Sequence, residues 1–164
     1  MNFYFRANCN KKVGMGHLSR TLKLANELHC RKHKCFFFLD NKKDLEHIKI
    51  EYPIIEIYKN DKYINQKKDA KKFINLIKNF GEGNIVLDDY RHDFIWEKEI
   101  KKNTRNKVIV ITDDVNKKHF ADYIVNYKVS GHLIKEVCNP LNQKTKYLLG
   151  PKYSLIGTKI KKRI

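Results

Sequence analysis

Short apolar runs alternate with amphipathic helical stretches along most of this 164-residue chain. Residues 35–39 form a continuous apolar run of the kind found in strands that are buried on both faces of a parallel sheet. Ahead of this run, Leu18, Leu22 and Ala25 recur at the three- and four-residue spacing of an amphipathic helix. The same alternation predicts strands at residues 2–7, 35–39, 54–58, 85–87, 108–111 and 123–125, and helices at 17–30, 69–80 and 94–102.

This order of elements predicts an α/β fold, because strands that take turns with helices pair in parallel and are covered on both faces. The economical architecture is a Rossmann-like, doubly wound and mostly parallel sheet that spans residues 1–150. A chain of this length has the size of one domain. Residues 151–164 are expected to form a basic tail, the part of the chain most prone to disorder.

The lysine-rich composition excludes few classes of function. Lys and Arg outnumber Asp and Glu by 35 to 18, which gives a net charge of +17. The lysines are scattered and accompany no recognised nucleic-acid-binding module, so the charge indicates a solvated surface and no nucleic-acid partner. No apolar run approaches the ~20 residues that span a bilayer. Residues 1–6 lack the order of a signal peptide, so we expect a cytoplasmic protein without a membrane span.

The four cysteines show no repeated metal-binding spacing. Cys30 and Cys35 lie near His29 and His33 in the sequence, but the cationic residues between them would oppose a bound cation. We therefore expect reduced thiols and no metal or other cofactor.

Polar side chains follow three of the predicted strands. In an open α/β sheet, ligands bind beyond the carboxyl ends of the strands, so these side chains are expected to converge there. The three groups are Arg6, Asn8 and the turn at 14–17; Asp88, Asp89, Tyr90 and Arg91; and Thr112, Asp113 and Asp114.

The turn at 14–17 leads from a strand into a helix. Gly14 and Gly16 allow the backbone to approach a ligand, and the free amides at the helix start suit a phosphate or a developing oxyanion. His17 lies in the first helical turn, where the helix dipole disfavours the imidazolium and keeps the ring neutral, as a general base requires. Two other interpretations stay open: His17 caps the helix or points to solvent, and the paired aspartates cap helices or bind a metal. A dinucleotide-binding fingerprint is less favoured, because Ser19 stands at its third glycine position.

Six segments together resemble one family. The chain is similar to the UDP-2,4-diacetamido-2,4,6-trideoxy-β-L-altropyranose hydrolases of pseudaminic acid biosynthesis and to the related spore-coat polysaccharide proteins. The matching segments are FRAN at 5–8, VGMGHLSR at 13–20, LDDY at 87–90, ITDD at 111–114, DYIVN at 122–126 and LLGPKYSL at 148–155.

The resemblance implies the amino-terminal domain of a glycosyltransferase-B-like fold, in which water displaces UDP from the anomeric carbon without a metal. His17 would activate the water, and Tyr90 would contact the sugar. The residues implied to line or brace the cleft are Arg6, Asn8, Gly14, Gly16, Arg20, Asp88 and Asp113. The family tends to have different residues at Asn8, Asp89 and Gly157.

The same resemblance predicts that residues 151–164 lead toward a second, nucleotide-binding domain that this chain does not contain, supplied by a separate domain or chain. Two alternatives to hydrolysis remain: a glycosyltransferase of the same fold, and a non-catalytic module that binds sugar nucleotides.

Overall fold

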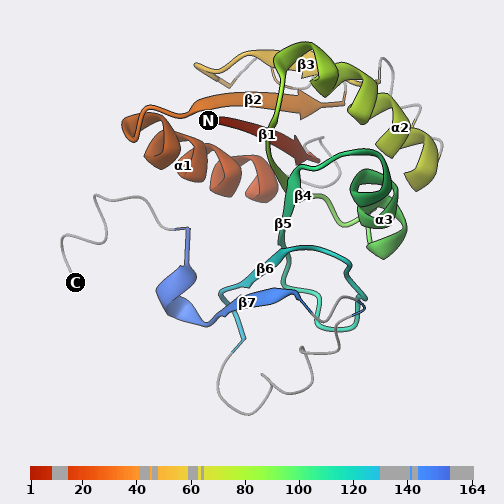
Figure 1. Cartoon of the computed structure of the whole chain (residues 1–164). Coiled ribbons are helices and arrows are strands. Elements are labelled where there is room, and N and C mark those ends of the chain that lie inside the picture. Colours follow the sequence, from red (N-terminus) through yellow and green to blue (C-terminus); the bar gives the residue numbers. More distant parts are fainter. Residues whose placement is uncertain are drawn as a thin grey trace.

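The computed structural model describes residues 1–8, 15–40, 45, 48–58, 63, 65–129, 141 and 144–155. Within these residues the chain forms one seven-stranded sheet with helices on both faces (Figure 1). The strands are β1 (Asn2–Ala7), β2 (Lys34–Leu39), β3 (Ile54–Glu56), β4 (Gly83–Asp88), β5 (Lys107–Ile111), β6 (Tyr123–Asn126) and β7 (Lys146–Leu149). The helices are α1 (Gly16–Cys30), α2 (Gln66–Ile77) and α3 (Phe94–Asn103), with short 3-10 turns η2 (Lys78–Phe80) and η4 (Pro151–Tyr153).

Every strand pair in the sheet is parallel, and the strand order is β3-β2-β1-β4-β5-β6-β7. The chain builds outward from β1 through β2 to β3, and then returns to the other side of β1 with β4. The predicted doubly wound, Rossmann-like α/β fold is therefore confirmed, and the sheet is parallel throughout. The order reverses between β1 and β4, and the carboxyl ends of these two strands form the crevice where such sheets bind ligands.

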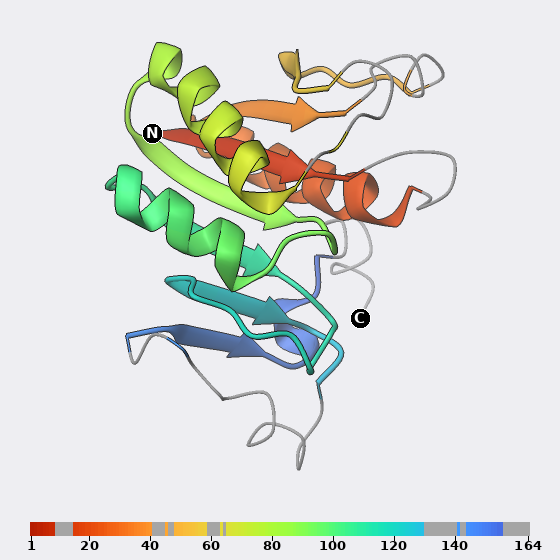
Figure 2. The same ribbon diagram turned by 90° about the vertical axis from the view of Figure 1, so that its right-hand side faces the viewer.

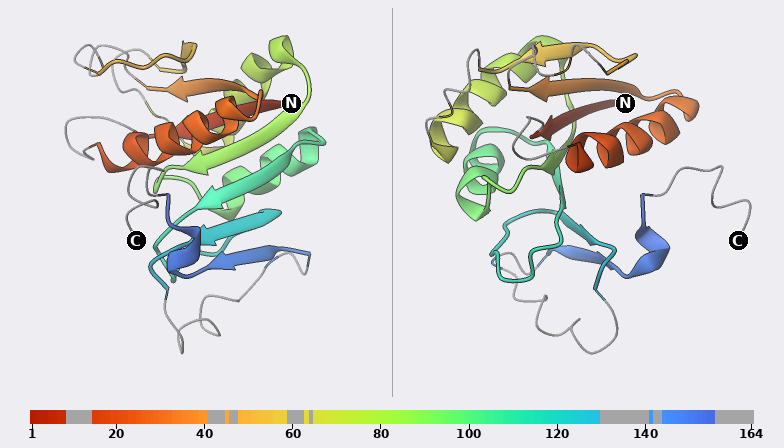
Figure 3. Two further views of the ribbon diagram at one scale, coloured as in Figure 1. Left: turned by 90° about the vertical axis from the view of Figure 1, so that its left-hand side faces the viewer. Right: turned by 180° about the vertical axis from the view of Figure 1, so that it is seen from behind.

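The helices lie on both faces of the sheet (Figures 2 and 3). Helix α1 covers one face and buries Leu18 and Ala25 against β1 and β2. Helices α2 and α3 pack side by side on the other face, where Phe73 and Trp96 join the core. Trp96 is fully buried.

Helix α2 begins and ends earlier than its apolar pattern predicts. Asn65 caps the helix by accepting a hydrogen bond from the Lys68 amide at 3.0 Å, so the helix begins ahead of the expected residue 69. The predicted last turn, 78–80, is the 3-10 turn η2, which stops at Gly81 with φ of 85°. Only glycine adopts this φ at little cost.

The sequence pattern did not predict the edge strand β7, a four-residue segment that pairs with β6. After β7 the chain turns at Gly150, with φ of 94°, into η4. Tyr153 and Leu155 then pack against the α1-side core. Residues 151–155 thus belong to the folded body, while the rest of the expected tail lies outside the described residues. No helix among the described residues has the length and apolar character needed to cross a membrane.

Candidate active site at the carboxyl edge of the sheet

The pleat of β4 directs two adjacent aspartates to opposite faces of the sheet. Leu87 packs in the core beneath α2 and α3, and successive strand residues alternate. Asp88 accordingly faces α1 and bonds to His17, whereas Asp89 faces α2 and α3 and pairs with Arg91. Two polar groups result, one on each side of the sheet.

On the α1 side, His17 and Asp88 form a closely bonded pair. Nδ1 of His17 lies 2.6 Å from Oδ1 of Asp88, and both residues are buried. A bare ring nitrogen and a carboxylate oxygen would repel at this distance, so the proton lies on Nδ1 and is donated to Asp88. The lone pair of the neutral ring is then on Nε2. An imidazole held in this way accepts a proton at Nε2, while the carboxylate stabilises the resulting imidazolium.

Arg20 lies one helical turn after His17 and donates hydrogen bonds to the same carboxylate, that of Asp88. Its Nε donates to Oδ2 of Asp88 at 2.5 Å, and its Nη2 donates to Oδ1. Burial alone would lower the pKa of Arg20, but the bonds and charge of Asp88 outweigh it and raise that pKa. Arg20 is therefore a permanent cation beside the pair.

Tyr90 packs against the edge of the His17 ring. The ring centroids are 4.4 Å apart and the planes meet at 81°, a T-shaped contact. The Tyr90 hydroxyl donates to one oxygen of Asp113, and Lys128 donates to the other. Partial burial would raise the pKa of Asp113, but the bonds from Lys128 and Tyr90 hold it below its usual value.

These side chains surround a hollow of about 470 Å³, a volume in the range of small-molecule sites. It lies beyond the start of α1 and the ends of β4, β5 and β6. Its lining residues are Gly16, His17, Ser19, Arg20, Lys23, Tyr90, Asp113, Tyr127, Lys128, Ser154 and Leu155. Among the described residues, the start of helix α1 has no side-chain cap and no acidic residue in its first turn. Gly16, its first residue, lines the hollow, so the positive end of the helix dipole lies at this wall.

The structure gathers most of the predicted site residues here. Gly16, His17, Arg20, Tyr90 and Asp113 line the hollow, and Asp88 lies beneath His17. Asn8 is buried just after β1, where its backbone N–H donates to the backbone carbonyl of Asp88 at 3.3 Å. Gly14 lies outside the described residues. Sequence reasoning missed Tyr127 and Lys128, although both directly follow a predicted strand at the same edge of the sheet.

Arg6 is not in the hollow, because alternation along β1 turns its side chain toward α2 and α3. It is fully buried, and its Nη2 lies 2.9 Å from Asp40 and 2.8 Å from Asp69. Arg91 joins the same group through Asp40 at 2.6 Å and Asp89 at 2.5 Å. We call these five residues the ionic network.

Because of the ionic network, the free energy of unfolding is expected to fall at acid pH. Burial would raise the pKa of Asp89, but the bond from Arg91 and the nearby cations lower it to about 2, and Arg6 likewise lowers the pKa of Asp69. A carboxylate in the unfolded chain has a pKa of about 3.9. The stabilisation is therefore complete above about pH 4 and is lost as the pH falls toward 2.

We accordingly expect the free energy of unfolding, measured with urea, to decline between about pH 4 and pH 2. Asp89→Asn should make this decline shallower. Glu51→Gln is the matched control, because Glu51 pairs with Lys49 at the exposed surface and should leave the slope unchanged. An unchanged slope in Asp89→Asn would contradict the assignment.

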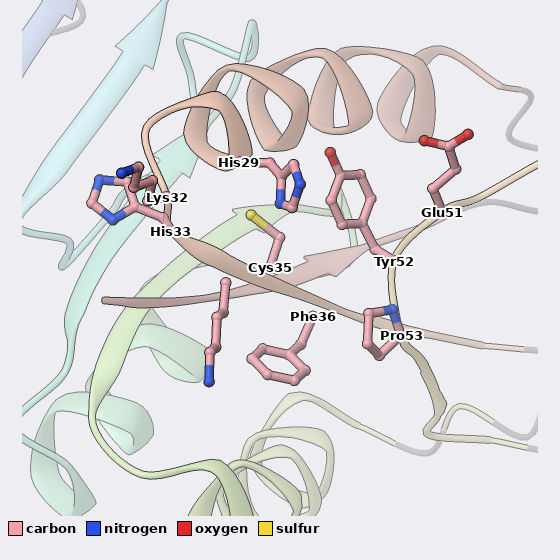
Figure 4. Close-up of a pocket in the computed structure, with 9 residues that line it drawn as sticks. His29, Lys32, His33, Cys35, Phe36, Glu51, Tyr52 and Pro53 are labelled. Carbon is pink, nitrogen blue, oxygen red and sulfur yellow. The ribbon is translucent and has the colours of Figure 1, made fainter.

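A second hollow, of about 440 Å³, lies at the opposite edge of the sheet, beside the end of α1 and the start of β2 (Figure 4). Its histidines and lysines, among them His29 and Lys32, complement the negative end of the α1 dipole. Its thiol, Cys35, donates to the Ala25 carbonyl, and burial raises the pKa of this thiol to about 11. A thiol with such a pKa is a poor nucleophile at neutral pH. The described residues contain no cluster of three or more side chains placed to hold a metal ion.

Two curated proteins are similar to this chain. An uncharacterized protein of Methanocaldococcus jannaschii is 27% identical over 157 residues, which cover 93% of this chain and 31% of that protein. The UDP-2,4-diacetamido-2,4,6-trideoxy-β-L-altropyranose hydrolase of Campylobacter jejuni is 28% identical over 126 residues, which cover 77% of this chain and 41% of the hydrolase. The chain thus spans less than half the length of each relative. No protein-family model matches the chain, and no solved structure matches it significantly.

Proposed function

We propose that the hollow at the carboxyl edge of the sheet hydrolyses a UDP-linked, acetamido-substituted deoxyhexose to UDP and the free sugar. The observation that carries this proposal is the buried bond of 2.6 Å between His17 and Asp88 at the wall of the hollow. The distant similarity to a UDP-sugar hydrolase supports the choice of substrate class.

In the proposed step, Nε2 of His17 takes a proton from a water molecule as the water oxygen attacks the anomeric carbon. The bond from that carbon to the diphosphate oxygen breaks, and UDP leaves with the bonding electrons. Asp88 stabilises the imidazolium that forms, and a single displacement inverts the anomeric centre. Gly16, the first residue of α1, lines the hollow, and the amides at the start of a helix suit the charge of a diphosphate.

We further propose that additional polypeptide completes the site. The relatives extend well beyond the region that matches this chain, which covers 31% and 41% of their lengths. Resemblance to the glycosyltransferase-B-like fold predicts a second domain that holds the nucleotide and faces this edge of the sheet. The sugar would then lie against His17 and Tyr90, and the uridine against the other domain.

Release of UDP from the UDP-linked sugar, followed by phosphorus NMR, tests the proposal. The chain is assayed alone and together with the remaining part of the Campylobacter jejuni hydrolase. We expect UDP and free sugar to appear in equal amounts, at a rate that does not depend on an added sugar acceptor. Absence of UDP in both assays would contradict hydrolysis, and release that requires an acceptor would favour a transferase.

A further inference from the structure

Arg20 connects three parts of the carboxyl edge to helix α1. Besides the two bonds to Asp88 at the end of β4, its Nη1 donates to the Tyr127 hydroxyl, just after β6, at 3.3 Å. Tyr90 also helps to raise the pKa of Arg20, although less than Asp88 does. The side chain is 12% exposed, so the planar guanidinium is held on several sides within the wall of the hollow.

The bonding capacities of these groups fix the position of the proton on the His17 ring. Nη2 of Arg20 lies 3.1 Å from Nδ1 of His17, the same nitrogen that bonds Asp88. A guanidinium only donates, so this contact alone would favour an unprotonated Nδ1. An ionised carboxylate only accepts, and its contact with Nδ1 is the shorter one, at 2.6 Å. While Asp88 stays ionised, Nδ1 therefore keeps its proton and Nε2 keeps its lone pair.

We infer that Arg20 is a positioning residue that holds His17 in the tautomer with Nδ1 protonated, by keeping the buried Asp88 carboxylate ionised and fixed. Asp88 is fully buried, and a buried carboxylate without a cationic partner tends to take up a proton. A protonated Asp88 would offer His17 a hydroxyl in place of an acceptor, and the ring would lose its preference for Nδ1–H. Tyr127 holds Arg20 from a second strand end and so contributes to the same arrangement.

The catalytic consequence rests on the proposed function, but the state of the ring does not. The other charged or titratable groups around the hollow are Lys23 on α1, Tyr90 after β4, Asp113 after β5, and Tyr127 and Lys128 after β6. Asp113 is already paired with Lys128 and Tyr90. Among the described residues, Arg20 is the arginine or lysine that forms an ion pair with Asp88.

Long-range proton–nitrogen NMR correlation of ¹⁵N-histidine-labelled chain measures this directly. In the wild type, we expect His17 to show a protonated Nδ1 and an unprotonated Nε2 at neutral pH. Arg20→Gln should remove this preference. Arg20→Lys should keep part of it, because lysine retains the charge but cannot form the bidentate contact with the carboxylate. Arg31→Gln is the matched control, since Arg31 is exposed at the far end of α1.

The outcomes separate this inference from the proposed function. In the UDP-release assay, Arg20→Gln should lower kcat by about 100-fold, the scale expected when a reacting group is misplaced. A folded Arg20→Gln chain whose His17 spectrum matches the wild type would overturn the inference. If Arg20→Gln does not fold, Tyr127→Phe provides the test: it should weaken the Nδ1–H preference, and an unchanged spectrum would count against the assigned contacts. A changed spectrum in a protein that never releases UDP would support the inference and refute hydrolysis.

Discussion

Replacing His17 with alanine should lower the rate of UDP release by about 10²- to 10⁴-fold, the usual contribution of a positioned general base. The substitution removes the nitrogen that accepts the proton of the attacking water, while the hollow and its cationic wall remain. The measurement is the initial rate of UDP formation at saturating UDP-sugar, in the protein form that proves active.

His33→Ala is the matched control for this prediction. His33 lines the hollow at the opposite edge of the sheet, so its loss should leave the rate unchanged. Circular dichroism and thermal unfolding must show that both variants stay folded. A His17→Ala protein that retains more than a tenth of the wild-type rate would refute the role of His17 as the base.

Replacing Arg6 with methionine should lower the free energy of unfolding by about 3–5 kcal/mol, the typical cost of removing one partner from a buried ion pair. Arg6 is fully buried and lies within 3 Å of Asp40 and Asp69, at 2.9 and 2.8 Å. Methionine keeps the aliphatic part of the side chain but removes the guanidinium, and so leaves these carboxylates without one of their neighbouring positive charges. Urea unfolding at neutral pH measures the loss.

Two further variants test whether the effect of Arg6 is electrostatic. Arg105→Met removes an exposed arginine and should change stability by less than about 0.5 kcal/mol. Combining Arg6→Met with Asp69→Asn should recover part of the loss, because the second substitution removes a charge that the first leaves uncompensated. A loss below about 1 kcal/mol in Arg6→Met would contradict the assigned network.

Most of the helices and strands could be predicted from the sequence, because the patterns that indicate them involve only residues that are close together in the chain. The apolar run at 35–39 and the leucine spacing in 17–30 depend only on neighbouring residues, and both became the expected element. Strand β7 carries no such signal: Tyr147, Leu148 and Leu149 are only partly buried, and their pairing depends on β6. The start of α2 was also misplaced, because its cap is a single side chain, Asn65, ahead of the apolar pattern.

The site was predictable as an edge of the sheet but not as a set of contacts. Strand ends and the glycine turn indicated where polar residues gather, and the family resemblance indicated His17. Which face Arg6 takes is decided by the packing of whole helices against the sheet, and neighbouring residues in the sequence do not show it. Tyr127 and Lys128 reach the hollow through pairing of β6 with β5, a long-range contact that a single sequence does not reveal.

The two adjacent aspartates at the end of β4 have different roles. One supports the proposed chemistry, and the other supports the stability of the fold. Asp88 belongs to the group that contacts His17, and Asp89 to the network that includes Arg91. A one-residue insertion or deletion within β4 would turn each of them to the opposite face of the sheet, away from its present partners. Length changes in this strand should therefore be tolerated far less than a side-chain substitution at the partly buried Asn84 near its start, and selection on folding and on chemistry would act there together.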